Sequence, residues 1–347
     1  MSEDHLSLFE GGPANDDGEP KARKRGRRPL IIALSILLVI LVAVGVTIAW
    51  YARSATKALD NIQRDPNIMP SRTSTVNKPR PSPVATPTGS EKAPLNFVLM
   101  GSDTRGDERG RSDVLQLLHI PSSRDAAYLL SIPRDSWVDI PGHGKGKINW
   151  AYSFGGPALT VETLEDLLDI PMDHTVIIDF SGFVKVIDAL GGVTVYNHHE
   201  SASRGHTFPK GEITLDGEAA LAFVRERYTL PSGDFDRAER QRDVIKAIVK
   251  KLSSAGVLTN PTKFADVVSE LGSQFTVDSG LTNEVIINLG MESTAAFGNI
   301  RTLGLPNLGP GWAGSQSIVQ VDWDAIADLK EALRNDDMDA FFYAHGG

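Results

Sequence analysis

The segment PLNFVLMG, residues 94–101, is the first part of the chain with the pattern of a buried β-strand. Phe97 and Leu99 alternate with Val98 and Met100, so both faces of the predicted strand are apolar. Such a strand is typical of a sheet that is covered on both sides. We therefore expect a folded domain to begin here.

Strand and helix patterns follow without strict alternation to the end of the chain. Further strands are predicted at 113–120, 126–132, 175–180, 193–196, 299–305 and 316–321. Helices are predicted at 157–168, 181–192, 217–227, 236–255, 261–273, 282–292 and 322–334. Ser181 is the expected N-cap of the second helix, and Gly191 or Gly192 its C-cap. This mixture predicts one α/β domain, a central mixed β-sheet flanked by helices on both faces.

The residues before this domain predict a membrane anchor and a tether. Residues 1–28 form a polar tail that ends in KARKRGRR, with six basic residues in eight. The predicted transmembrane helix, 29–51, includes the 21 uncharged residues 30–50, and a helix of that length spans about 30 Å of hydrocarbon. A cleaved signal peptide is the alternative, but the apolar core is too long for one. The basic block places the tail in the cytoplasm and the domain, 93–347, outside the cell membrane. Between them, residues 52–92 are rich in Pro, Ser and Thr and predict an extended linker.

Composition excludes several classes of chemistry. The chain has no cysteine, so disulfides, zinc–thiolate sites and thiol catalysis are excluded. Its formal net charge of −9 argues against a nucleic-acid binder. GSDTRG at 101–106 has the spacing of a phosphate-binding loop, but Asp107 stands where the lysine is needed. His198, His199 and His206 fit a solvated edge better than a zinc site.

Arginine is concentrated in one short segment, VRERYTLPSGDFDRAERQRD at 224–243. Projected as a helix at 100° per residue, the segment after 236 places Arg237 and Gln241 on the apolar face. Arg240 and Arg242 fall at the margin of that face, and we expect them to be surface salt-bridge partners. An arginine and a glutamine directed inward at a helix N-terminus indicate either a first turn that extends beyond the core or a polar cavity suited to a phosphate.

Acidic and basic side chains also stand at predicted strand ends. Asp103 follows the first strand, Asp113 opens the next, and Arg134 follows the third. Ligand sites of open α/β sheets are built at such ends. Two carboxylates suit a hard cation, Mg²⁺ or Mn²⁺, that also takes phosphate oxygens. A metal with Arg134, Arg225, Arg227 and Arg237 around a diphosphate is the apparatus of phosphoryl transfer.

Outside the membrane there is no ATP pool, so an activated phosphoryl donor has to arrive preformed. A lipid diphosphate in the membrane meets that need, and an anchored domain on a short tether fits such a substrate.

Several segments, in this order, resemble the LytR–CpsA–Psr proteins of bacterial cell envelopes. They are NFVLMGSD, GRSDVLQLL, LLSIPRDSWVDIPG, KINWAYSFGGP, FSGFVKVIDALGGV, LDGEAALAFVRER and GDFDRAERQ, which run from about 96 to 250. The resemblance implies an enzyme that transfers an anionic glycopolymer, such as teichoic acid or arabinogalactan, from a polyprenyl-diphosphate carrier to a peptidoglycan hydroxyl. It also implies an LCP-type sheet with a tunnel for the polyprenyl chain.

Carried over residue by residue, the resemblance assigns roles in this sequence. Asp103 and Asp113 match the metal ligands, and Asp103 is also our candidate base. Phe183, Val184 and Ile187 are candidates for the tunnel lining, although core packing explains each of them equally well. The matches to the diphosphate-binding residues are Arg134, Arg225, Arg227, Arg237 and Gln241, with Arg105 as a further contact and Lys147 and Asp234 as weaker candidates. The alternative function is a non-catalytic envelope regulator or a glycan- or lipid-binding module.

Overall fold

The computed structural model describes residues 59–71, 80–82, 92–102, 112–254 and 271–345. The predicted tail (1–28) and transmembrane helix (29–51) lie outside this part of the chain. Among the residues that are described, no helix has the length and apolar character needed to cross a membrane.

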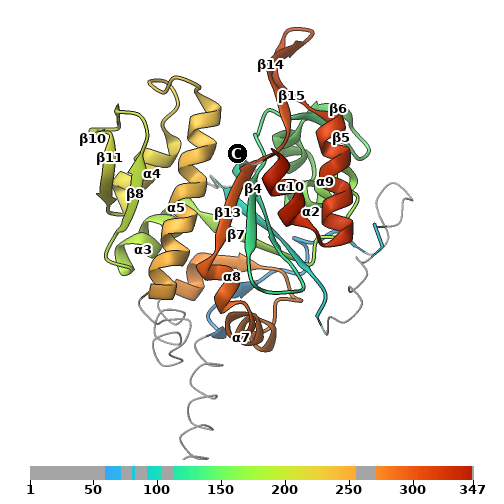
Figure 1. The fold of residues 1–347 in the computed structure, drawn as a ribbon, viewed down its shortest axis with the longest axis horizontal. Coiled ribbons are helices and arrows are strands. Elements are labelled where there is room, and N and C mark those ends of the chain that lie inside the picture. Colours follow the sequence, from blue (N-terminus) through green and yellow to red (C-terminus); the bar gives the residue numbers. More distant parts are fainter. Residues whose placement is uncertain (1–58, 72–79, 83–91, 103–111, 255–270, 346–347) are drawn as a thin grey trace, which may run out of the picture. The chain divides into compact units, whose positions relative to one another are not determined.

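A seven-stranded mixed sheet forms the centre of the described fold (Figure 1), with the strand order β1-β12-β7-β2-β3-β4-β13. Its strands are β1 (Gln63–Arg64), β2 (Leu95–Ser102), β3 (Ser112–Ile120), β4 (Ala127–Ser131), β7 (His174–Asp179), β12 (Phe275–Val277) and β13 (Ile300–Gly304). β2 pairs with β7 in parallel and with β3 in antiparallel orientation. The predicted mixed sheet is confirmed, and β3 pairs with β4 in antiparallel orientation.

Side chains on the two faces of the sheet pack into two separate hydrophobic cores. On one face, Val98 and Met100 pack with α2 (Ile148–Leu168), α9 (Trp323–Asn335) and α10 (Met338–His345). On the other, Phe97 packs with α5 (Asp234–Ser254), α7 (Asn283–Glu292) and α8 (Thr294–Gly298). Helices therefore cover both faces, as the doubly apolar pattern of β2 predicted.

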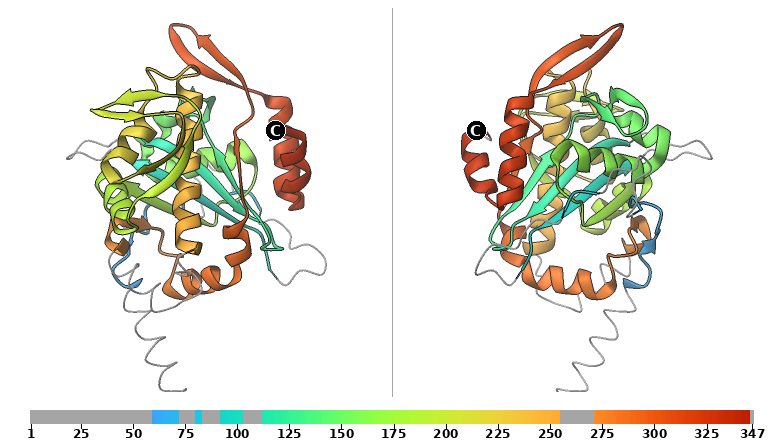
Figure 2. Two further views of the ribbon diagram at one scale, coloured as in Figure 1. Left: turned by 60° about the vertical axis from the view of Figure 1, so that its left-hand side comes forward. Right: turned by 90° about the vertical axis from the view of Figure 1, so that its right-hand side faces the viewer.

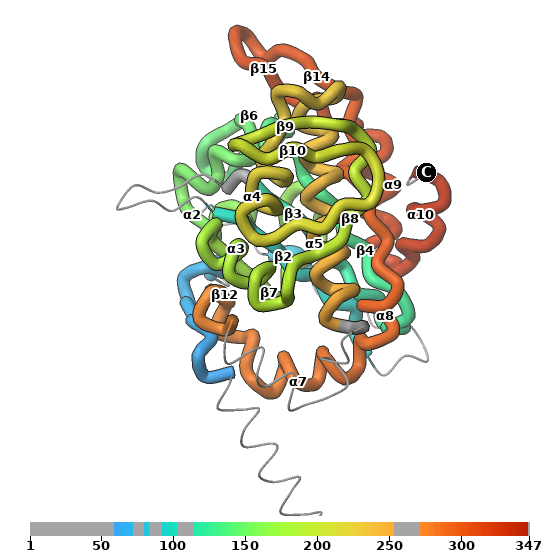
Figure 3. The backbone as a smooth tube through the Cα atoms, turned by 90° about the vertical axis from the view of Figure 1, so that its left-hand side faces the viewer, coloured from blue at the N-terminus to red at the C-terminus, as the bar shows by residue number. Residues whose placement is uncertain are grey.

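A further layer lies outside α5 (Figure 3). It contains α3 (Phe180–Ala189), α4 (Gly217–Arg225), β8 (Val193–Asn197), β9 (Ser201–Ser203), β10 (His206–Phe208) and β11 (Gly211–Leu215). Its own apolar core includes Phe223 and reaches Val244 of α5. α5 is thus covered by the sheet on one side and by this layer on the other.

Several boundaries differ from the sequence-based expectation. α2 begins nine residues earlier than predicted, because its first two turns precede a kink at Gly156, where φ is +70°. Pro157 opens the straight part after that kink, as its missing N–H allows. The N-cap of α3 is Asp179 and not Ser181, since the Asp179 carboxylate accepts a hydrogen bond from the backbone N–H of Gly182 at 2.6 Å.

Short hairpins were missed, because a few residues of strand carry little periodicity. They are β5 (Trp137–Ile140) with β6 (Gly144–Lys147), β9 with β10, and β14 (Asn307–Ala313) with β15 (Gln316–Val321). Only β15 of these was predicted as a strand. The β14–β15 hairpin projects away from the neighbouring elements (Figure 2). Most of the predicted helix 261–273 lies outside the described residues, and at 272–274 the structure has a single 3₁₀ turn.

The predicted linker, 52–92, contains a stretch that folds onto the domain. Leu59 is fully buried, and β1 adds a strand to the edge of the sheet by pairing with β12. Arg80 forms an ion pair with the buried Glu165 of α2. Where this segment is described, the prediction of an extended linker is therefore wrong. The segment is polar overall, so its composition did not indicate that side chains such as Leu59 and Arg80 contact the domain.

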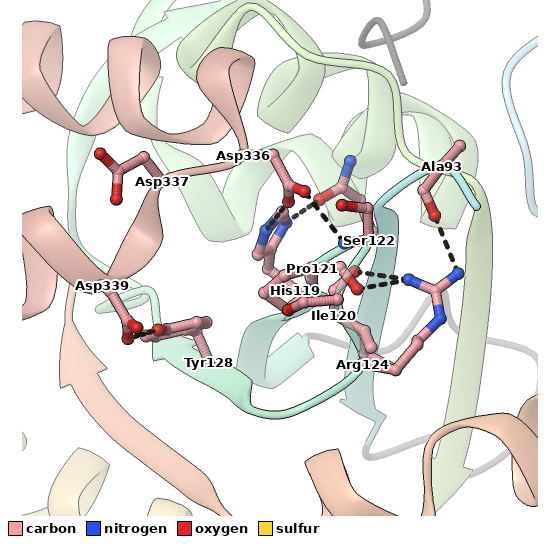
Figure 4. A network of polar contacts seen from close by, with 12 residues as sticks. Ala93, His119, Ile120, Pro121, Ser122, Arg124, Tyr128, Asp336, Asp337 and Asp339 are labelled. Carbon is pink, nitrogen blue, oxygen red and sulfur yellow. Dashed lines mark hydrogen bonds and ion pairs between the residues drawn. The ribbon is translucent and has the colours of Figure 1, made fainter. Parts of the chain in front are cut away.

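Buried polar contacts join the two C-terminal helices to the sheet (Figure 4). Asp336, in left-handed conformation at the end of α9, accepts a hydrogen bond from the backbone N–H of Ser122 at 3.0 Å. The same carboxylate lies 3.5 Å from Nε2 of His119. Burial opposes its ionisation, but these contacts outweigh burial and hold the pKa of Asp336 below its ordinary value. Arg124 closes the β3–β4 turn through backbone carbonyl oxygens, among them that of Ala93.

Candidate functional site

Five arginines converge on one pocket beside the ends of β2 and β4. The pocket has a volume of about 200 Å³, and we call it the arginine pocket. The arginines in its lining are Arg134, Arg204, Arg225, Arg227 and Arg237, accompanied by Val114, Phe180, Val224, Tyr228 and Gln241. Guanidinium groups are permanently charged and bind phosphate oxygens through two parallel hydrogen bonds. Five of them in one pocket make a site for a polyanion.

One carboxylate, Asp234, joins three of these arginines at the first residue of α5. Its oxygens lie 3.3 Å from Nη1 of Arg227, 3.3 Å from Nη2 of Arg237 and 3.9 Å from Nε of Arg134. The chain reaches this position through a turn that ends at Gly233, where φ is +56°, a conformation that glycine adopts readily. Asp234, a weaker candidate in the sequence, thus holds arginines from three different segments together.

Local backbone geometry directs Arg225 and Arg227 to the same pocket. The residue between them, Glu226, is extended (φ −68°, ψ 135°) after the end of α4, and side chains two positions apart on an extended chain lie on the same side. Arg225 stacks over the ring of Phe180, with its guanidinium carbon 4.3 Å from the ring centroid. Arg227 donates a hydrogen bond to the hydroxyl of Tyr228 at 3.0 Å, which raises the pKa of Arg227.

The helical projection of α5 is correct for two residues and wrong for two others. Arg237 and Gln241 are each 8% exposed and line the arginine pocket, and Gln241 donates a hydrogen bond to the carbonyl oxygen of Val224. Arg240, expected at the surface, is 5% exposed. Arg242 is largely covered too: it donates a hydrogen bond to Ser131 of β4, and burial lowers its pKa.

Arg240 is held by contacts with the outer layer of the fold. Its Nη2 donates hydrogen bonds to Asn197 Oδ1 at 2.8 Å, the carbonyl oxygen of His199 at 2.9 Å and Ser201 Oγ at 2.8 Å. The guanidinium also stacks over Phe223, 4.1 Å from the ring centroid. Arg240 therefore fastens the outer layer to α5 and does not line the arginine pocket.

An apolar cavity adjoins the arginine pocket on the side of the sheet. It has a volume of about 200 Å³ and shares Val114, Phe180, Val224 and Gln241 with that pocket. The rest of its lining is Leu99, Met100, Gly101, Val176, Ile178, Asp179, Phe183, Val186, Leu221, Ile245, Ile248 and Phe275.

Of the three candidate tunnel residues, Phe183 alone lies on the wall of this cavity. Ile187 is fully buried in the core of the outer layer. Val184 lies against α4, where a side chain added at Gly217 would meet its carbonyl oxygen at 2.4 Å. Ile187 is therefore a core residue, and Val184 packs against α4 outside the apolar cavity.

A larger polar cleft also adjoins the arginine pocket, at residues that do not line the apolar cavity. It has a volume of about 730 Å³ and shares Arg134 and Arg227 with the arginine pocket. The other residues of this polar cleft are Asp135, Lys147, Asn149, Trp150, Ser153, Phe154, Asp234 and Ser317. Lys147, the other weaker candidate, pairs with Asp135 at 3.2 Å.

Of the two candidate metal ligands, Asp113 alone lies among the described residues, near the start of β3. Asp103 and Arg105 lie outside the described residues, and for Asp113 the backbone is described but not the side chain. Gly101 pairs with Val114 and Ser102 pairs with Ser112, so Asp113 is the extra residue of a β-bulge. Bulges redirect side chains and occur often beside active sites. Two carboxylates here would suit Mg²⁺ by their oxygen donors; elsewhere in the described chain, no cluster of three acidic or histidine side chains could hold a metal.

Arg204 and Tyr228 are pocket residues that sequence reasoning missed. Arg204 occupies the turn between β9 and β10 with φ of +51°, and that hairpin was not predicted. Tyr228 is adjacent to Arg227, so its place in the segment that gave the other arginines could have identified it. No spacing rule could have identified Arg204, which reaches the pocket only through tertiary packing.

Comparisons with known proteins agree with this geometry. Residues 52–335 match the family model described as the LytR_cpsA_psr family. A polyisoprenyl-teichoic acid–peptidoglycan teichoic acid transferase TagU of Bacillus cereus (strain AH820) is 36% identical over 247 residues, 71% of this chain and 80% of that protein. A transferase of the same name from Enterococcus faecalis is 32% identical over 319 residues, 90% of this chain and 98% of that protein.

Solved structures have the same fold. The crystal structure of B. subtilis TagV superposes with a TM-score of 0.63 at 30% identity, covering 72% of this chain and 98% of that one. The structure of TagT bound to LI-WTA gives a TM-score of 0.60 at 28% identity, covering 77% and 98%. The fold is shared, and the chain belongs to the LytR_cpsA_psr family.

Proposed function

We propose that this protein is a membrane-anchored transferase that moves an anionic glycopolymer from a polyprenyl-diphosphate carrier to a peptidoglycan hydroxyl. The observation that carries the proposal is the continuity of the apolar cavity with the arginine pocket through Val114, Phe180, Val224 and Gln241. A polyprenyl diphosphate has the same two parts, an apolar chain and a diphosphate. The names of the relatives support a teichoic acid as the polymer.

In the proposed reaction, the acceptor hydroxyl attacks the phosphorus nearest the sugar, and the bond from that phosphorus to the bridging oxygen breaks. The electron pair leaves with the bridging oxygen, so the second product is polyprenyl phosphate. Arg134, Arg225, Arg227 and Arg237 hold the diphosphate and offset the negative charge that develops on the bridging oxygen. Little acid catalysis is needed, because a phosphate is a good leaving group.

Asp103 and Asp113 are the proposed ligands of Mg²⁺, which when bound would neutralise phosphate charge. The hydroxyl proton is taken by a base, for which we propose Asp103. Asp234 has a different role, because its carboxylate is engaged by Arg227 and Arg237. It positions those guanidinium groups before the substrate binds, and such preorganisation is a main source of electrostatic catalysis.

The test uses the full chain in detergent with a synthetic polyprenyl-diphosphate glycopolymer and peptidoglycan fragments. We expect polymer transfer with release of polyprenyl phosphate in Mg²⁺ or Mn²⁺, and neither in EDTA. Asp103→Asn and Asp113→Asn should remove the metal-dependent turnover and leave the thermal midpoint nearly unchanged. Tight donor binding without release of polyprenyl phosphate would refute the transferase and favour the binding module. Full activity of both variants would refute the metal assignment.

The anchor is a separate proposal that rests on the basic tail and the apolar segment at 29–51. We place the N-terminus in the cytoplasm and the domain outside, where lipid-linked polymer and peptidoglycan meet. Protease added to intact protoplasts should digest the domain while a tag at residue 1 stays protected. Digestion of the tag would reverse the orientation, and recovery of the domain in the soluble fraction would refute the anchor.

A further inference from the structure

The walls of the polar cleft differ in charge from those of the arginine pocket. The arginine pocket is lined by five arginines. The cleft has three cationic side chains, Arg134, Lys147 and Arg227, and two carboxylates, Asp135 and Asp234. Its formal excess is a single positive charge, and two of its opposite charges, Lys147 and Asp135, lie 3.2 Å apart. The cleft therefore suits an occupant with many hydroxyl and amide groups and little charge.

One face of the first part of α2 lines this cleft. Asn149, Trp150, Ser153 and Phe154 belong to its lining, and residues three and four positions apart are neighbours on the surface of a helix. The kink at Gly156 directly follows this face. The backbone N–H of Asn149 donates a hydrogen bond to the carbonyl oxygen of Arg134 at 3.2 Å, so this face is fixed relative to the arginine pocket.

Aromatic rings form a continuous series on this side of the cleft. Trp137 of β5 contacts Trp150 edge to face at 6.1 Å between centroids, and Trp150 contacts Phe154 at 6.4 Å. His143 stacks on Phe154 at 4.6 Å. Phe154 is nevertheless 42% exposed. Aromatic rings between hydrogen-bonding side chains are the means by which proteins hold sugar rings, whose C–H faces pack on aromatic surfaces.

The β14–β15 hairpin extends the same surface. Ser317 of β15 lines the cleft, and its direct partner across the hairpin is Trp312. Side chains of directly opposed residues lie on the same face of a two-stranded ribbon. Trp312 is 75% exposed, so a large aromatic ring stands in water on the face of the hairpin that borders the cleft.

The direction of the reaction decides which sugar occupies the cleft. In phosphoryl transfer the attacking and leaving oxygens lie roughly in line on opposite sides of the phosphorus. The leaving polyprenyl phosphate extends toward the apolar cavity, which joins the arginine pocket at Val114 and Phe180. The attacking hydroxyl therefore enters away from the apolar cavity, and the polar cleft joins the arginine pocket at Arg134 and Arg227, which do not line that cavity.

We propose that the polar cleft is the acceptor subsite, in which Phe154 and Trp150 hold the sugar that carries the attacking hydroxyl, and that Trp312 holds a further sugar of the same strand. The occupant is an uncharged or weakly charged N-acetylated glycan. The assignment of the cleft to an acceptor rests on the proposed transferase function. The binding of a glycan strand in the cleft does not rest on that function, because it follows from the low net charge of the cleft and from its exposed aromatic rings.

The first experiment measures binding of soluble, uncross-linked peptidoglycan oligosaccharides to the full chain in detergent, by saturation-transfer NMR and by titration. Phe154→Ala should weaken binding about tenfold, the loss expected when one aromatic stacking contact of about 1.4 kcal/mol is removed. Trp312→Ala should weaken binding of a hexasaccharide but not of a disaccharide. Tyr196→Ala removes an exposed aromatic ring of β8 in the outer layer and should change neither.

The second experiment measures transfer at saturating donor while the acceptor concentration varies. Phe154→Ala should raise the acceptor KM about tenfold and leave the donor KM unchanged. A rise in donor KM instead would overturn the acceptor assignment and place the donor glycan in the cleft. Unchanged oligosaccharide binding in Phe154→Ala, with an unchanged thermal midpoint, would overturn the glycan site altogether. Binding that is lost in this variant while the wild type transfers nothing would refute the proposed function and leave the glycan site standing.

Discussion

Two arginines of α5, Arg237 and Arg240, allow a matched comparison between a residue of the arginine pocket and a residue that stabilises the fold. They lie three residues apart on one helix and are 8% and 5% exposed. Arg237 pairs with Asp234 and lines the arginine pocket. Arg240 binds the outer layer through three acceptors and the ring of Phe223. Replacement by lysine keeps the charge in both and removes the planar fork in both.

Arg237→Lys should reduce the transfer rate and leave the fold nearly unchanged. Lysine cannot grip two phosphate oxygens at once, and one lost hydrogen bond to a charged group costs about 1.5–3 kcal/mol. That corresponds to roughly a ten- to hundredfold loss in rate. The ion pair with Asp234, at 3.3 Å, adds little to stability because Asp234 also keeps its contacts with Arg227 and Arg134.

Arg240→Lys should have the opposite effect. An ammonium group at this position cannot reach Asn197, His199 and Ser201 and also stack over Phe223. Loss of two net hydrogen bonds costs about 2 kcal/mol, and a domain of this size loses roughly 2–4 °C in thermal midpoint per kcal/mol. We therefore expect a fall of about 4–8 °C with less than a threefold change in rate.

The assay pairs calorimetry with transfer kinetics on the same preparations, at a temperature well below both midpoints. Equal rate losses in the two variants would show that Arg240 contributes to transfer as much as Arg237 does, and the distinction between site and scaffold would be wrong. A large fall in midpoint for Arg237→Lys without a rate loss would make Arg237 a structural residue, and the assignment of the diphosphate site to these arginines would be wrong.

Three further substitutions test the scaffold. Burial opposes ionisation of Asp278, but hydrogen bonds from His174 and from backbone N–H groups outweigh it and lower the pKa of Asp278, so its contribution is present at neutral pH and is lost as pH falls below about 4. Asp278→Asn should thus lower the thermal midpoint at pH 7 by more than at pH 3; a constant difference would contradict the assignment. Gly217→Ala should cost about 1–3 kcal/mol in unfolding free energy, because its Cβ would lie 2.4 Å from the carbonyl oxygen of Val184. Gly290→Ala, in α7 with open space around it, should stabilise by about 0.5–1 kcal/mol in denaturant unfolding; a loss at Gly290 equal to that at Gly217 would refute the steric argument.

The fold could be predicted from sequence because its central strands carry a clear local signal. Phe97 and Val98 are apolar on successive positions, so the two helical layers follow from β2 alone. The short hairpins could not be predicted in the same way. β9 and β10 are three residues each, too short for a period of two to stand out, and with them Arg204 was missed.

The candidate site was predicted in part, for a reason visible in α5. A helical projection assumes that a helix has one buried face. For α5 the projected face contains Arg237 and Gln241, and both are buried. The same helix has a second buried side, because the outer layer covers it and Val244 belongs to that layer's core. Arg240 faces this outer layer, and a projection with a single buried face could not predict its burial. Burial on two sides is a property of the tertiary arrangement and leaves no separate periodic signal.

The charge of the arginine pocket explains why its arginines are held so firmly. Arginine cannot relieve repulsion by losing a proton in proteins, so like charges in one pocket have to be balanced by carboxylates or by a ligand. Asp234 balances part of the charge and contacts Arg134, Arg227 and Arg237 together. Arg225 instead lies over Phe180, where the ring face offsets some of its charge. The remaining positive charge fits the two phosphates of the proposed donor, and it lies between an apolar cavity and a nearly neutral cleft. The order of these three compartments, and not the arginines alone, is what distinguishes a transferase from a simple anion-binding protein.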